Sequence, residues 1–139
     1  MKLGILVFPQ VEELDFVGPW EMATMWKQVA DGPDCLLVAE HAAPVVCAKG
    51  LSVNPHHGFA DCPPLDVLVV PGGQGTRTEV HNRALVDFVA RQAQGCQAVL
   101  SVCTGAFVLH AAGLLAGRRA TTHWGALGRL AALGDVQVV

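Results

Sequence analysis

Cys103 is the residue whose type and position point most clearly to chemistry. It lies in residues 98–109, AVLSVCTGAFVL, where an apolar strand-like run passes directly into a helix-like run. At such a turn the free N–H groups of the helix end face the side chain, and their partial positive charge lowers a thiol pKa from about 8.5. Cys103 is therefore predicted to be a nucleophilic thiolate, although a small buried hydrophobic cysteine would also fit this position.

Asp15, Gly72 and Gly73 also follow apolar runs that are predicted to be strands. Asp15 would be either an acid/base carboxylate or a helix cap. The glycines would let backbone N–H groups approach a ligand closely, and Gly73 is predicted to supply an oxyanion-type donor. No Gly-Lys-Ser/Thr follows this turn and the dinucleotide spacing is absent, so nucleotide binding is not expected.

The histidines of the chain differ in how closely they could approach the thiol. His123, beside Trp124, would either polarise Cys103 as in a Cys-His pair or be a packed histidine that acts indirectly. His110 lies two helical turns, roughly 10 Å, past Cys103 and is too far to contact it. His56 and His57 would be either at a pocket mouth or solvated.

The cysteines do not have the spacing of a metal site or a disulfide framework. The chain has five, with no C-x-x-C pair and no paired histidines at ligand spacing. They are Cys35, Cys47, Cys62, Cys96 and Cys103. We therefore expect no bound metal and no disulfides.

The elements that must position these residues alternate between strands and helices. Strands are expected at residues 2–8, 35–39, 66–70, 98–102 and 135–139, with a hairpin within 45–53 and a loop over 54–64; helices are expected at 16–30, 79–94, 107–115 and 123–133. Solid apolar strands of this kind favour a mostly parallel sheet buried on both faces. Its carboxyl edge would bring together Asp15, the Gly72-Gly73 turn and Cys103.

Composition excludes several classes of function. The 139 residues are enough for one core, and 52% of them are hydrophobic against 15% charged. A formal charge of −3 with nine Lys plus Arg gives no basic field for nucleic acid. The N-terminus lacks the pattern of a signal peptide, so a cytoplasmic location is expected. Polar residues and glycines interrupt residues 98–117, which argues against a membrane span.

Three segments carry a resemblance to a known family. They are VFPQVEELDFVGPWE, FADCPPLDVLVVPGGQG and SVCTGAFVLHAAGLLAGRRATTHW. The chain resembles, almost end to end, the ThiJ/PfpI superfamily of class I glutamine amidotransferase-like proteins, and within it the isonitrile hydratase group. The resemblance implies an α/β fold: a flavodoxin-like three-layer sandwich with a nucleophile elbow. It also implies a homodimer without metal or organic cofactor, and one domain over residues 1–139 that lacks the family's usual C-terminal part.

The resemblance also assigns roles to the site residues. Cys103 matches the reactive cysteine, Asp15 the acid that faces it, Thr104 the residue after the nucleophile, and Gly73 the neighbouring backbone donor. Thr104 stands where protease-like and amidase-like members carry His, which argues against peptidase chemistry. Asp15 stands where chaperone-like and deglycase-like members usually carry Glu.

The function implied by the resemblance is hydration of an isonitrile to an N-substituted formamide. Cys103 would attack the terminal carbon, Asp15 would transfer protons, and the Thr104 and Gly73 amides would position the intermediate. Trp20, Phe107 and Trp124 would form the apolar wall of a pocket for a small-molecule substrate. The alternatives are the ligand-sensing domain of an AraC-type regulator and another small-molecule amidase or glyoxalase-type enzyme.

Overall fold

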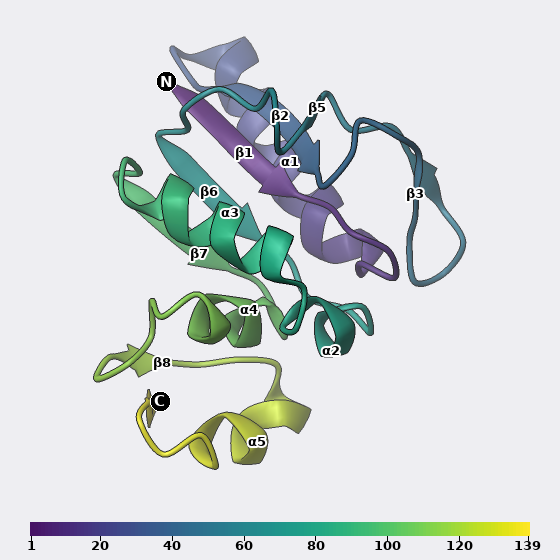
Figure 1. Cartoon of the computed structure of the whole chain (residues 1–139). Helices are drawn as coiled ribbons and strands as arrows, with labels where there is room; N and C mark the ends of the chain where they lie inside the picture. The colour runs from purple at the N-terminus through teal and green to yellow at the C-terminus, as the bar shows by residue number, and fades with distance from the viewer.

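A five-stranded parallel sheet forms the centre of the molecule (Figure 1). The computed structural model describes all 139 residues. The strand order is β5-β2-β1-β6-β7, and every neighbouring pair is parallel. The strands are β1 Lys2–Leu6, β2 Asp34–Ala39, β5 His57–Gly58, β6 Val67–Val70 and β7 Ala98–Ser101. The predicted mostly parallel sheet is confirmed, and β5 is a short addition within the expected loop.

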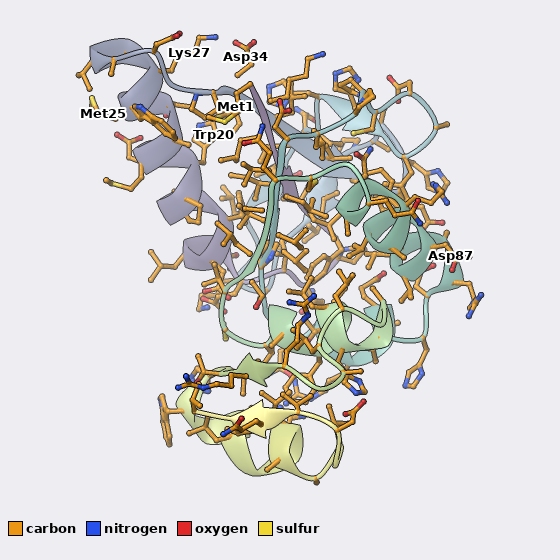
Figure 2. The ribbon with its side chains drawn as sticks, turned by 90° about the vertical axis from the view of Figure 1, so that its left-hand side faces the viewer. Met1, Trp20, Met25, Lys27, Asp34 and Asp87 are labelled. Atoms are coloured by element: carbon orange, nitrogen blue, oxygen red, sulfur yellow. The ribbon has the colours of Figure 1, made fainter.

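Two helices cover the opposite faces of this sheet. α1 Glu13–Val29 lies on one face and α3 Arg83–Ala93 on the other, as the edge-on view in Figure 2 shows. The inner face of α3 buries Leu85, Phe88 and Val89 against the sheet, while Ile5 and Leu68 in the central strands are fully buried. The predicted three-layer α/β sandwich is therefore correct.

The direction of winding reverses between β1 and β6. From β1 the chain passes through α1 to β2 on one side, whereas β6 and β7 extend the sheet on the other side. At such a switch point the loops after adjacent strands diverge and leave a crevice at the carboxyl ends. The segments after β1, β6 and β7 meet at this edge.

The helix expected at residues 79–94 begins four residues later, as α3, and only Glu79 of that range belongs to a separate short helix. α2 Thr76–Glu79 is followed by a break, and α3 begins after Asn82. The Asn82 side chain accepts hydrogen bonds from the backbone N–H groups of Ala84, at 3.1 Å, and Leu85, at 3.5 Å. Asparagine is a strong N-cap, and this capping starts a new helix within an apolar pattern that otherwise suggested a continuous one.

Later element boundaries also differ from those expected. α4 Gly105–Ala111 begins before the predicted residue 107 and ends before residue 115, because Gly113 adopts a left-handed φ of 75° that terminates helices. The helix expected at 123–133 is a 3₁₀ turn, η1 Trp124–Ala126, followed by α5 Leu127–Ala131. α1 begins at Glu13 rather than residue 16, so Asp15 lies in its first turn.

Strand β7 is an edge strand and not one buried on both faces as predicted. It pairs only with β6, and the Leu100 side chain is 52% exposed. The apolar run of residues 98–102 could not reveal this, because exposure at an edge depends on whether another strand follows in space.

The remaining strands form two small pairs outside the central sheet. β3 Val45–Val46 and β4 Ser52–Val53 form the antiparallel hairpin expected around Lys49-Gly50. β8 Arg119–Ala120 and β9 Gln137–Val138 pair in parallel, and with α5 they lie beyond α4 at the foot of Figure 1. None of the helices has the length and apolar character needed to cross a bilayer.

Candidate functional site

Cys103 lies at a strained turn between β7 and α4. Its φ is 53°, in the left-handed region that residues other than glycine seldom adopt. Such a conformation costs about 1–3 kcal/mol and persists where the surroundings enforce it. The Val102 N–H donates to the Val70 carbonyl at 3.0 Å, and a Cβ on Gly105 would come within 2.1 Å of that oxygen. The start of α4 thus sits tightly against the end of β6 and holds the elbow.

Asp15 faces the thiol from the first turn of α1. The residue is 9% exposed, and its Oδ2 accepts a hydrogen bond from the Gly72 N–H at 3.0 Å. Burial raises the pKa of the carboxyl, and the Gly72 and Cys103 hydrogen bonds partly oppose that effect. Glu12 occupies the cap position of α1, so the alternative role of Asp15 as that cap is excluded.

The predicted lowering of the thiol pKa is not what this environment produces. Burial raises the pKa of Cys103, and the neighbouring Asp15 carboxylate raises it further, while the Thr104 N–H opposes both. α4 has seven residues, so its end contributes little positive potential against desolvation and an adjacent carboxyl. The pKa values of Cys103 and Asp15 are therefore both shifted toward the protonated form of the group.

The Thr104 hydroxyl joins the elbow to the glycine turn. Its Oγ1 accepts a hydrogen bond from the Gly73 N–H at 3.1 Å and lies 3.1 Å from Thr76 Oγ1. Thr76 Oγ1 also donates to the Gly73 carbonyl at 2.8 Å. Thr76 is buried and was not singled out from the sequence, where only its place after a glycine turn marks it.

The two glycines lie at the site as predicted, but their N–H groups already have partners. The Gly72 N–H donates to Asp15 and the Gly73 N–H to Thr104 Oγ1. The N–H that faces the sulfur is that of Thr104 itself. Gly73 therefore presents no free oxyanion donor in this arrangement, and the donor next to the thiol is the Thr104 amide.

Thr122 holds the other side of the elbow. Its hydroxyl donates to the Cys103 carbonyl at 2.9 Å from the segment between β8 and η1. No spacing in the sequence indicates this contact, since 19 residues separate the two partners.

These residues border a cavity of about 540 Å³. Cys103, Asp15, Thr104 and Gly73 line it together with His123. The further lining residues are Glu12, Leu14, Gln74, Arg77, Gly125, Ala126 and Arg129. The cavity opens at the carboxyl edge of the sheet, where the parallel topology predicted it.

His123 belongs to this cavity, and its imidazole also has a structural task. Its Nδ1 accepts a hydrogen bond from the Gly125 N–H at 3.1 Å and so caps η1. The positive form of His123 lowers the pKa of Asp15, which places it as a neighbour of the acid. No hydrogen bond joins it to Cys103, and a Cys-His pair does not form.

The aromatic residues expected to line the substrate pocket lie elsewhere. Trp20 stacks on His56 with ring centroids 5.5 Å apart, outside the cavity, and Trp124 is 82% exposed. Phe107 is absent from the lining and lies beneath the Arg129 guanidinium. None of the three aromatic residues lines the cavity, whose lining comes from the turns after β1, β6 and β7 and from α1, α2, η1 and α5.

The other histidines lie outside the cavity. His110 pairs with Asp135 at 2.8 Å, and the His56 Nδ1 accepts from the Leu37 N–H at 2.9 Å. No cluster of three or more His, Cys, Asp or Glu side chains has a geometry that could hold a metal ion.

Gly72→Ala is expected to destabilise the protein by about 1–3 kcal/mol, because the new methyl group has no room. Its Cβ would lie 2.5 Å from the Thr104 backbone nitrogen and 2.9 Å from Asp15 Oδ2. Gly128→Ala in α5 is the matched control, since its Cβ meets nothing within 4 Å and alanine favours helix. Urea unfolding measures the free energy of unfolding of each variant. Equal values for Gly72→Ala and Gly128→Ala would contradict the expected close packing.

Comparisons with known proteins identify relatives of this chain. The DJ-1/PfpI family matches residues 1–139. Isonitrile hydratase from Pseudomonas putida is 43% identical over 140 aligned positions, covering 99% of this chain and 59% of that protein. The crystal structure of a ThiJ/PfpI family protein from Pseudomonas syringae superposes with a TM-score of 0.86 at 34% identity, covering 98% of this chain and 55% of that one.

A regulator is also similar over part of the chain. The HTH-type transcriptional regulator GbdR from Pseudomonas aeruginosa is 36% identical over 80 residues, which are 58% of this chain and 22% of that protein. The chain thus spans less than two thirds of the length of each of these three relatives.

Proposed function

The chain belongs to the DJ-1/PfpI family, and from that membership together with its Cys103–Asp15 pair we propose that it hydrates isonitriles to N-substituted formamides. The observation that carries the proposal is the placement of the Cys103 thiol, the Asp15 carboxyl of raised pKa and the Thr104 N–H at one cavity. The 43% identity to an isonitrile hydratase supports the choice of reaction.

The first half of the reaction forms a covalent thioimidate. The Cys103 thiol gives its proton to Asp15 while its sulfur attacks the terminal carbon of R–NC, forming a C–S bond. Asp15 then delivers that proton to the same carbon, which leaves R–N=CH–S attached to Cys103. Burial suits Asp15 to this exchange, because a carboxyl with raised pKa is a stronger base and remains able to hold the proton.

The second half adds water and restores the enzyme. Asp15 accepts a proton from water as the water oxygen attacks the thioimidate carbon, and then gives that proton to the imine nitrogen. The tetrahedral adduct R–NH–CH(OH)–S then expels the sulfur while Asp15 transfers the hydroxyl proton to it, and R–NH–CHO leaves. The Thr104 N–H next to the sulfur would stabilise charge at this carbon centre. The sum is R–NC plus water giving the formamide.

The direct test is incubation of the purified protein with two simple isonitriles, the neutral cyclohexyl isonitrile and the anionic isocyanoacetate. We expect loss of the isonitrile and formation of one equivalent of formamide, both measured by liquid chromatography and mass spectrometry. An absence of formamide over hours at micromolar protein would overturn the proposal.

Ligand sensing in an AraC-type regulator is the second candidate function. The similarity to part of GbdR supports it, since the same cavity could hold an effector without turnover. A compound that raises the melting temperature of the protein yet is recovered unchanged would favour sensing over hydration.

We further propose a homodimer that works in the reducing cytoplasm. The outer face of α1 carries exposed apolar side chains, among them Met22, Met25 and Val29, and Met25 points away from the rest of the molecule in Figure 2. Burial of such a face between two copies would be favourable. Light scattering at twice the monomer mass supports this assembly, and a strictly monomeric mass argues against it.

The cysteines are all free thiols, which suits a reducing compartment.

A further inference from the structure

Two arginines at the cavity lack an acidic partner. Arg77 from α2 and Arg129 from α5 both line the cavity that holds Cys103. Neither forms an ion pair, whereas Arg83 pairs with Asp87 and Lys49 pairs with Glu12. Arg77 instead donates to the neutral Gln74 side chain. The positive charge of both guanidinium groups is therefore available to a ligand.

The acids at the cavity do not neutralise this charge. Glu12 is engaged with Lys49, which approaches from the β3–β4 hairpin. Asp15 is buried, and its Oδ2 already accepts the Gly72 N–H. Both guanidinium groups therefore line the cavity without an acidic partner of their own.

Arg129 is held at the cavity by an aromatic contact. Its guanidinium carbon lies 5.1 Å from the centre of the Phe107 ring. This cation–π contact limits the freedom of the side chain before a ligand arrives, so less entropy is lost on binding. Planar guanidinium groups bind carboxylates through paired hydrogen bonds, which a point charge such as lysine does not provide.

From these contacts we infer that the substrate is anionic: an isonitrile whose R group carries a carboxylate, held by Arg77 and Arg129 while its terminal carbon lies at Cys103. The inference rests on the proposed function for the isonitrile group, and on the two unpaired arginines for the carboxylate. It accounts for the two arginines in the lining, where a wall of Trp20, Phe107 and Trp124 was expected.

The first experiment compares isocyanoacetate with its neutral methyl ester as substrates. We expect the ratio of kcat/KM for the acid over the ester to fall about 5-fold in Arg77→Gln and about 5-fold in Arg129→Gln, as for loss of one ion pair. The change should appear mainly in KM. Arg83→Gln on α3 removes the same charge away from the cavity and should leave the ratio unchanged.

The second experiment keeps the two proposals separable. Cys103 is alkylated with anionic iodoacetate and with neutral iodoacetamide, and the ratio of the two rates is measured by mass spectrometry. We expect the ratio of the iodoacetate rate to the iodoacetamide rate to fall about 5-fold in Arg77→Gln and in Arg129→Gln. The difference in this ratio between wild type and each variant should shrink at high salt. Arg83→Gln again serves as the control.

The outcomes distinguish the inference from the reaction it rests on. A ratio that falls only in Arg77→Gln and Arg129→Gln supports an anion-selective cavity even if no isonitrile is hydrated, in which case the reaction alone is wrong. Alkylation ratios equal in all variants overturn the anionic substrate, whether or not isonitriles are consumed.

Discussion

Cys103→Ser is expected to reduce formamide formation by about 10³-fold or more, because the sulfur forms the covalent intermediate and a hydroxyl is a far poorer nucleophile at neutral pH. Serine is close in size to cysteine, so the elbow with its φ of 53° should persist. The melting temperature of Cys103→Ser should stay near that of the wild type. The measurement is the initial rate of formamide release under saturating isonitrile.

Cys35→Ser provides the matched control for this loss. Cys35 is a half-buried free thiol in β2, outside the catalytic cavity. We expect its hydration rate to remain within about 2-fold of wild type, since substitutions away from functional features have small effects. Retention of half the wild-type rate in Cys103→Ser would remove the thiol from the mechanism. Mass spectrometry of a stalled reaction should also find the adduct on Cys103 and on no other cysteine.

Asp15→Asn is expected to lower kcat by about 10²–10⁴-fold, which is the usual contribution of a positioned acid/base group. The amide oxygen of asparagine can still accept the Gly72 N–H, so the local structure should survive while proton transfer is lost. Asp87→Asn is the control, because Asp87 is a half-exposed carboxylate on α3 that does not line the cavity; Figure 2 labels it at that helix. A variant of Asp15 with wild-type kcat would show that the acid does not move protons in this reaction.

Asp15→Asn should also change the titration of the Cys103 thiol. The Asp15 carboxylate raises the pKa of Cys103, so its removal lowers that pKa and shifts the pH profile of iodoacetamide alkylation to lower pH. A merely structural role for Asp15 would leave the profile in place, which makes this readout independent of turnover. Asp87→Asn should not move the profile.

Asp15→Asn should also alter how stability depends on pH. Burial raises the Asp15 pKa above its ordinary value of 3.8, so the folded protein binds this proton more tightly than the unfolded chain. The resulting stabilisation is complete below about pH 3.8 and is lost as pH rises through the raised pKa. Asparagine does not titrate, and the melting temperature of the variant relative to wild type should therefore increase from pH 4 to pH 8. A constant difference between the two proteins would contradict the raised pKa.

Local sequence patterns predicted the strands well because strand formation here depends on short apolar runs. Within the expected ranges 2–8 and 66–70, β1 and β6 lie at the centre of the sheet, and residues 3–6 and 68–70 are buried, as continuous apolar runs indicate. The Lys49-Gly50 hairpin followed from turn residues in the same way. Helix ends were less predictable, because Asn82 and Gly113 act through capping and a left-handed φ within otherwise continuous apolar patterns.

The meeting of Cys103, Asp15 and the glycine turn was also predictable from order alone. Parallel strands place their carboxyl ends at one edge, and that rule required no knowledge of side-chain positions. By contrast, Thr76 and Thr122 contact the elbow through packing between distant segments, and nothing in their spacing indicated it.

The sequence by itself thus determined the parallel α/β architecture and the identity of the residues at the carboxyl edge, since both follow from local apolar patterns and chain order. Only the tertiary structure decided the electrostatics of the site. Burial raised the pKa of Cys103 where the helix end predicted a lower one, and Thr104 and Asp15 took up the N–H groups of Gly73 and Gly72. Desolvation and hydrogen-bond partners depend on which distant residues surround a group, and the cavity lining with Arg77 and Arg129 arises for the same reason.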